Sequence, residues 1–121
     1  MSASSFRDLR VWQQSMELAA NVYRGTETFP KHELYGLTSR MRRAAVSVPS
    51  NIAEGKGHCS DKDFRRFLFH ARGSLMELET QMALASKLQY LSPEQLQNLQ
   101  DQATQVGKSL AGLLNALSEA A

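Results

Sequence analysis

Apolar residues recur at intervals of three and four along most of this chain, and strand-like alternation is nearly absent. This spacing places the apolar side chains on one face of a helix, so it predicts an all-α protein. Four segments carry such stripes and predict helices at about residues 7–28, 33–55, 61–89 and 93–118. Because the connections are short, we expect residues 1–121 to form one domain, an antiparallel up-down-up-down four-helix bundle.

Each predicted helix has its own expected core face. The predicted stripes are Leu9, Trp12, Met16, Ala19 and Tyr23; Leu34, Leu37, Met41, Ala44, Val48 and Ile52; Phe64, Leu68, Ala71, Leu75, Leu78, Met82 and Ala85; and Leu96, Leu99, Ala103, Val106, Leu110, Leu113 and Leu117. Four apolar residues lie outside these stripes, namely Val11, Leu18, Phe67 and Phe69. Such extra apolar surface is typical either of a wide core face or of a partner interface.

The predicted helix ends rest on residues with known terminal preferences. Ser60 and Ser92 are suited to cap the third and fourth helices, because a serine hydroxyl accepts from a free amide of the first turn. The residue before Pro30 avoids the α region, so the first helix should end there. Gly55 and Gly57 are interpreted as the stop of the second helix.

Pro49 lies within the second predicted helix. A proline there removes one hydrogen bond and costs about 3 kcal/mol, so the segment is either two helices or one bent helix. The apolar stripe passes from Ala44 through Val48 to Ile52 without a change of phase. This continuity favours one helix, kinked at Pro49.

Composition places the chain among ordinary globular proteins, with 42% apolar and 21% charged residues. No apolar run is long enough to cross a membrane, and the opening MSASSFRDLR lacks the apolar core of a secretory signal. Cys59 is the single cysteine, which agrees with a reducing compartment. We therefore expect a cytoplasmic protein without a membrane partner.

Positive charge is concentrated in the first three quarters of the chain. Residues 1–90 hold 13 basic and 9 acidic groups, whereas residues 91–121 hold one basic and three acidic groups. Clustered Lys and Arg residues can neutralise phosphates, although no exposed aromatic stacking platform is expected beside them. The candidate nucleic-acid contacts are Arg40, Arg42, Arg43, Lys56, Lys62, Arg65, Arg66 and Arg72.

Two rows of polar residues run beside the apolar stripes, on the second and third predicted helices. They are Arg40, Arg43, Ser47, Asn51 and Glu54, and Arg66, His70, Ser74, Glu77 and Gln81. If the rows face each other, Arg43 can pair with Glu77, and Glu54 with Arg66. A structural network is favoured here over a ligand site, because ion-pair networks often resemble functional sites. Its candidate members are Arg43, Asn51, Glu54, Ser74 and Glu77.

No catalytic constellation is visible in the sequence. His58, Cys59, Asp61 and Asp63 share one short loop, but a zinc site needs a second ligand pair at a defined spacing. The chain has no Glu-x-x-His pair for a di-metal bundle and no glycine-rich phosphate loop. We therefore expect no enzyme activity, no metal and no cofactor.

Three segments carry a family resemblance, namely FRDLRVWQQSMELAANVY, TFPKHELYGLTSRMRRAAVSVPSNIAEG and FRRFLFHARGSLMELETQMALASKLQYL, within Phe6–Leu91. Their most specific parts are the run Tyr35–Gly55 and the pattern Gly73, Ser74, Glu77, Leu78, Thr80 and Gln81. Together they resemble the S23, or 23S rRNA intervening-sequence, family. The resemblance implies a four-helix bundle that forms a ring-shaped homopentamer. It also implies a kinship with nucleic-acid-binding accessory proteins of diversity-generating retroelements, and no enzymatic activity.

Two functional hypotheses remain from the sequence. In the first, a homo-oligomer binds RNA or DNA through its basic cluster. In the second, the oligomer is a protein-interaction scaffold without nucleic-acid affinity, and the arginines are internal struts. The two differ in whether Arg40, Arg42 and Arg43 point outward to a phosphate backbone or into the bundle.

Overall fold

The structure is a computed structural model and describes residues 5–58 and 60–120. Its four long helices are α1 (Arg10–Thr26), α2 (Leu37–Lys56), α3 (Asp61–Lys87) and α4 (Pro93–Ala120). Two short 3₁₀ helices, η1 (Phe6–Asp8) and η2 (Lys31–Glu33), precede α1 and α2. Every regular element of the described chain is helical, which confirms the all-α prediction.

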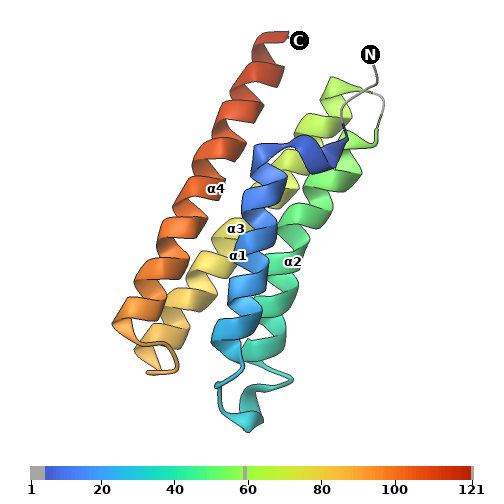
Figure 1. Ribbon diagram of the computed structural model, residues 1–121. Helices are drawn as coiled ribbons and strands as arrows, with labels where there is room; N and C mark the ends of the chain where they lie inside the picture. The colour runs from blue at the N-terminus through green and yellow to red at the C-terminus, as the bar shows by residue number, and fades with distance from the viewer. Residues whose placement is uncertain (1–4, 59, 121) are drawn as a thin grey trace.

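Each long helix packs against two others. α2 lies between α1 and α3, and α4 contacts α1 and α3. In Figure 1 successive helices run in alternating directions, so α4 ends near the end of the bundle where α1 begins. A polar contact also joins α1 to α4, because the Ser109 hydroxyl donates to Oε1 of Gln14 at 2.6 Å.

The core contains the predicted faces of α2 and α3. All seven predicted residues of α3, from Phe64 to Ala85, are buried, as are the α2 residues from Leu37 to Ile52 that the stripe contains. Full burial of a Leu or Met side chain contributes about 1.5–3 kcal/mol, so this shared interface is a main source of stability. On α4, Leu114 is buried, whereas Leu113 and Leu117 are half-buried.

The predicted face of α1 is correct only in part, because Ala19 is buried and Leu9 and Trp12 pack against the core, but two other members are exposed. Met16 and Tyr23 are each 44% exposed, whereas Val11 and Leu18 are 3% and 1% exposed and belong to the core. The buried face also contains Ser15, whose hydroxyl donates to a carbonyl one turn earlier in the same helix. An apolar pattern misses such a face, because a serine that bonds its own helix can be buried. Val11 and Leu18 therefore cannot form a partner interface.

Helix α2 begins at Leu37, four residues later than predicted. Oε1 of Glu33 accepts a hydrogen bond from the Leu37 amide at 3.1 Å, so this carboxylate satisfies one of the free amides of the first turn. Leu34 is exposed and leaves the predicted stripe, and Tyr35 is 93% exposed. The helix then continues through Pro49 as one element, while a bend at Pro49 stays a prediction.

Gly55 lies inside α2, not at a stop. A β-carbon at this position would be 2.6 Å from Cβ of Phe67, which is closer than side chains tolerate. Glycine therefore permits α2 and α3 to approach each other here. The helix ends one residue later, at Lys56.

The other helix ends agree better with the sequence. Ser60 Oγ accepts from the Asp63 amide at 3.1 Å, and Ser92 Oγ accepts from the Gln95 amide at 3.1 Å, so both serines cap their helices. The first helix is shorter than predicted, because η1 is separate and α1 ends at Thr26. No helix in residues 5–58 and 60–120 is long and apolar enough to span a membrane.

Candidate nucleic-acid interface

The two polar rows approach each other where the middle of α2 packs on α3. The hydroxyl oxygens of Ser47 and Ser74 are 2.8 Å apart and share a hydrogen bond. Nδ2 of Asn51 donates to the Ser47 carbonyl at 2.8 Å and to its hydroxyl at 3.0 Å. The Ser47–Ser74 bond joins the middle of α2 to the middle of α3, and Asn51 supports Ser47 from within α2. We call this surface the α2–α3 polar face.

The ion pairs expected within this face are not formed. The ion pairs of the described chain are His32 with Glu33, and His58 and Arg66 with Asp63. The predicted pairs Arg43–Glu77 and Glu54–Arg66 are therefore wrong, and the hydrogen bond between the rows is the one that joins the Ser47 and Ser74 hydroxyls. A small pocket of about 220 Å³ lies there, lined by Arg40, Arg43, Ala44, Ser47, Ser74 and Glu77.

Arg42 has a different environment from its neighbours Arg40 and Arg43, which are exposed. Its Nε donates to Oγ1 of Thr26 at 2.9 Å, and its guanidinium lies 4.7 Å from the ring centroid of Tyr23. Both partners belong to the last turn of α1, where a cation is favoured by the helix dipole. Arg42 thus holds the end of α1 against α2, and this contact engages its guanidinium within the bundle.

A cluster of aromatic and basic residues occupies the first half of α3. Phe69 is 47% exposed, and the guanidinium carbons of Arg65 and Arg72 lie 5.7 and 5.6 Å from its ring centroid. Arg65 and Arg72 stand four residues before and three residues after Phe69, so all three share one helix face. We call this group the Arg–Phe–Arg cluster. The sequence-based expectation of no exposed aromatic platform is therefore wrong.

Phe67 extends the aromatic surface toward the end of α2. Its ring centroid lies 4.5 Å from the Arg66 guanidinium carbon and 4.9 and 6.1 Å from the ring centroids of His58 and His70. Arg66 also pairs with the Asp63 carboxylate at 3.8 Å. Cations and rings therefore alternate on this part of the surface.

The remaining predicted contacts lie near the junction of α2 and α3. Lys56 is half-buried, with its ammonium 5.8 Å from the Phe64 ring, and Lys62 is exposed. The structure thus divides the predicted basic residues into an α2 group, Arg40 and Arg43, and a group around the start of α3. Cys59 lies outside the described residues, so the structure does not test what the sequence suggests about this residue.

A polar contact that the sequence does not indicate joins two distant loops. The Tyr90 hydroxyl donates to Oε2 of Glu33 at 3.0 Å. The hydrogen bonds from the Leu37 amide and from Tyr90 lower the pKa of the Glu33 carboxyl. The same bond to Glu33, together with burial, raises the pKa of Tyr90. The partners are 57 residues apart, and no local pattern predicts their pairing.

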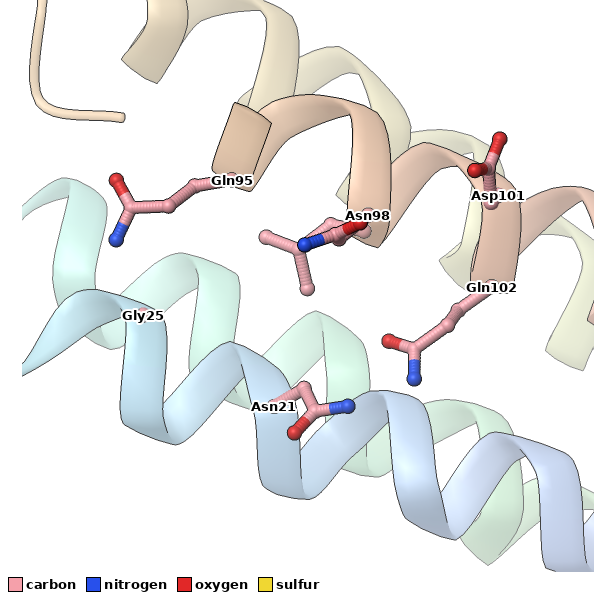
Figure 2. Close-up of a pocket in the computed structure, with 7 residues that line it drawn as sticks. Asn21, Gly25, Gln95, Asn98, Asp101 and Gln102 are labelled. Carbon is pink, nitrogen blue, oxygen red and sulfur yellow. The ribbon is translucent and has the colours of Figure 1, made fainter. Parts of the chain in front are cut away.

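A second pocket lies between α1 and α4 (Figure 2). Its volume is about 480 Å³, and its lining residues are Asn21, Gly25, Gln95, Asn98, Leu99, Asp101 and Gln102. Sequence reasoning missed it, because its amides lie outside the apolar stripes and belong to helices at opposite ends of the chain. The repeated Asn and Gln residues of α4 are a signal that could have indicated it.

Comparisons with known proteins agree with the resemblance found in the sequence. No curated protein matches the chain. A crystal structure of a protein of unknown function from the S23 ribosomal protein family of Bacteroides thetaiotaomicron is similar, with a TM-score of 0.77 and 22% identity. The match covers 86% of this chain and 97% of that chain, and shows a shared fold. The sequence model of the 23S rRNA-intervening sequence proteins matches residues 7–112. The chain therefore belongs to the 23S rRNA-intervening sequence protein family.

Proposed function

We propose that this chain is a non-enzymatic, homo-oligomeric protein of the cytoplasm that binds single-stranded RNA or DNA. The observation that carries the proposal is the Arg–Phe–Arg cluster, in which Arg65 and Arg72 flank the exposed ring of Phe69. Proteins that bind single strands combine cations for the phosphates with aromatic rings on which bases stack. Both elements occur here on one helix face, where Phe69 and Arg72 are exposed and Arg65 is half-buried.

The α2 arginines supply further phosphate contacts in this proposal. Arg40 and Arg43 are exposed and have no carboxylate partner within 4.0 Å in the described chain. Their charges are thus available to a ligand, whereas Arg42 is engaged with Thr26. Binding through such cations releases counterions and depends strongly on salt.

Self-association is supported by exposed apolar surface on two different faces. An apolar groove of about 400 Å³ lies between α1 and α2, and its larger side chains are Trp12, Met16, Tyr23, Val46 and Pro49. On α3, Met76 and Leu84 are exposed. Two unlike surfaces on one subunit permit a heterologous contact, which forms a ring when the rotation between neighbouring subunits closes. We propose a pentamer, in which five copies would carry a net charge of +10.

Fluorescence anisotropy with labelled single-stranded RNA and DNA tests the binding. Replacing Arg65 and Arg72 together by Ala should weaken binding and reduce the slope of log affinity against log salt by about 1.4, or about 0.7 for each lost cation. Phe69→Ala should weaken binding about tenfold and leave the slope unchanged, because stacking releases no counterion.

A charge-matched control is available on α1. Arg10 and Arg24 are exposed and belong to α1, which carries none of the proposed contacts, so replacing both by Ala removes the same charge. This control should bind nearly as well as the natural protein. The proposal fails if neither polymer binds at low salt, or if the control loses as much affinity as the cluster variant.

The second candidate is a protein-interaction scaffold, and the apolar α1–α2 groove favours it. Under this alternative nucleic-acid affinity stays at background for the natural protein and all variants. Light scattering tests the oligomer separately, since a mass near 13.5 kDa would show that the chain stays a monomer.

A further inference from the structure

The small pocket in the α2–α3 polar face, here the α2–α3 pocket, has a volume of about 220 Å³. Pockets for drug-sized ligands hold about 300–1,000 Å³, so this one suits a smaller unit. None of the described residues that line it is aromatic. Its chemistry therefore suits a sugar or a phosphate group better than a base, and it differs in this respect from the Arg–Phe–Arg cluster.

Two cations are available in this pocket. Arg40 and Arg43 line it and are exposed, and within the described chain neither has a carboxylate partner within 4.0 Å. Their guanidinium groups therefore keep their N–H donors for an anion. A guanidinium matches the geometry of a phosphate, which it can bind through two parallel hydrogen bonds.

The serine hydroxyls of the pocket provide a further donor. The oxygens of Ser47 and Ser74 share one hydrogen bond at 2.8 Å, and Oγ of Ser47 also accepts from Asn51 at 3.0 Å. Each hydroxyl carries one proton. The shared bond uses one proton of the pair and leaves the other, whichever serine donates. The pocket can therefore donate a neutral hydrogen bond beside its two cations.

A carboxylate accompanies these donors. Glu77 lines the pocket and is exposed, and its Oε2 accepts from Nε2 of Gln81 at 3.5 Å. A carboxylate has about four lone-pair sites and is an acceptor only, so its partner on a ligand must be a donor. A phosphate alone would be repelled by Glu77. The lining therefore matches a ligand in which a phosphate and a neutral hydroxyl are close together.

We propose that the α2–α3 pocket binds a ribose with its adjoining phosphate and thereby selects RNA over DNA. This inference rests on the proposed strand binding and names the polymer. The phosphate lies against Arg40 and Arg43, while the 2′-hydroxyl donates to Glu77 and accepts the remaining serine proton. The 2′-hydroxyl, which is both donor and acceptor, is the group by which proteins distinguish RNA from DNA. Deoxyribose lacks it and leaves both groups of the pocket without a partner.

Fluorescence anisotropy with oligouridylate and oligodeoxyuridylate of equal length tests the selection, because the two strands differ only in the 2′-hydroxyl. Oligouridylate should bind at least about tenfold more tightly. The 2′-O-methyl oligouridylate should bind as weakly as the DNA strand, since it has no proton to donate to Glu77. Equal affinities for RNA and DNA would overturn the inference and leave strand binding intact. Absence of binding to all three strands would refute the proposed function as well.

A variant at Glu77 locates the selection. Glu77→Ala removes a negative charge, so DNA affinity should stay unchanged or rise, whereas RNA affinity should fall and the ratio of the two should approach one. Glu79→Ala removes the same charge from an exposed position of α3 outside the pocket and should keep the ratio. A ratio unchanged in Glu77→Ala, or lowered equally in Glu79→Ala, would refute the site.

The arginines of the pocket test the phosphate contact separately. Replacing Arg40 and Arg43 together by Ala should weaken both polymers and reduce the slope of log affinity against log salt by about 1.4. An unchanged slope would show that no phosphate lies against them, and the proposed arrangement would be wrong.

Uridine monophosphate distinguishes a strand from a free nucleotide as the source of the sugar and phosphate. It cannot reach the Arg–Phe–Arg cluster at the same time, so displacement of labelled oligouridylate should need a concentration at least about a hundredfold higher than unlabelled oligouridylate requires. Displacement at equal concentrations would assign the pocket to a free nucleotide and overturn the proposed selection of RNA.

Discussion

A β-carbon on Gly55 would lie 2.6 Å from the β-carbon of Phe67, so α2 and α3 meet at van der Waals contact with no room for a side chain between them. We predict that Gly55→Ala lowers the free energy of unfolding by about 1–3 kcal/mol, because the helices must separate to accept the methyl group. Urea denaturation monitored by circular dichroism measures the change.

Gly73 provides the matched control on α3. It is exposed, and a β-carbon there would meet nothing within 4 Å. Gly73→Ala should therefore raise stability by up to about 1 kcal/mol, the difference in helix propensity between the two residues. A stabilised Gly55→Ala variant would contradict the proposed close approach.

Arg42 should matter for stability more than its neighbour Arg40. Arg42→Ala removes the bond to Thr26 and the cation at the end of α1, so we expect a loss of about 1–2 kcal/mol. Arg40→Ala, at an exposed position of the same helix, should change stability by less than about 0.5 kcal/mol. Thermal unfolding of both variants checks the difference, and equal effects would show that the Thr26 contact contributes nothing.

Glu33 should make stability depend on acid pH. Its pKa is held below the ordinary value of 4.5 by hydrogen bonds from the Leu37 amide and Tyr90. The ionised carboxylate therefore stabilises the fold above pH 4.5, and this contribution is lost as pH falls through the lower folded-state pKa. Denaturation between about pH 7 and pH 3 should show a smaller loss for Glu33→Gln, because its amide does not titrate.

Tyr90, which donates to Glu33, should make stability depend on alkaline pH. The pKa of Tyr90 is raised above its ordinary value of 10.0, chiefly by its bond to Glu33. Its contribution is therefore complete below pH 10 and disappears as pH rises through the higher folded-state pKa. Tyr90→Phe should remove this alkaline dependence, and an unchanged alkaline profile would show that the hydroxyl makes no stabilising bond.

The proposed self-association places a contact at the α1–α2 groove. Val46 is exposed in this groove, so Val46→Glu should leave the subunit folded while it places a charge in the contact. Light scattering should then report a mass near 13.5 kDa instead of a multiple of it. Gln105→Glu, which adds the same charge on α4 outside the groove, should keep the oligomer. A natural protein that is already monomeric would reject the proposal directly.

The sequence predicted best those elements whose core faces are wholly apolar. Every predicted core residue of α3 is buried, because no polar residue interrupts its stripe. On α1 the buried face includes Ser15 and Thr26, whose hydroxyls bond to carbonyls of their own helix. Hydrophobic periodicity cannot detect a buried hydroxyl that bonds to its own helix. The predicted face therefore included Met16 and Tyr23, which are exposed.

The sequence indicated which helices carry the candidate site, but not which contacts its side chains make. Helical spacing defined the two polar rows, and the Ser47–Ser74 bond brings their middles together. The sequence did not show which arginine would be bound within the bundle. The contact of Arg42 with Thr26 depends on how α1 packs on α2. The exposure of Phe69 between two arginines also depends on which face of α3 has no neighbouring helix.

The bond between Ser109 and Gln14 joins positions 95 residues apart, whereas the bond between Ser47 and Ser74 spans 27 residues. Closing a longer stretch of chain costs more entropy, and contacts distant in sequence form more slowly. We therefore expect the contact between α2 and α3 to form early during folding and the contact between α1 and α4 to form last. The pocket between α1 and α4 would then exist only after folding is complete, and it would be lost first when the protein opens.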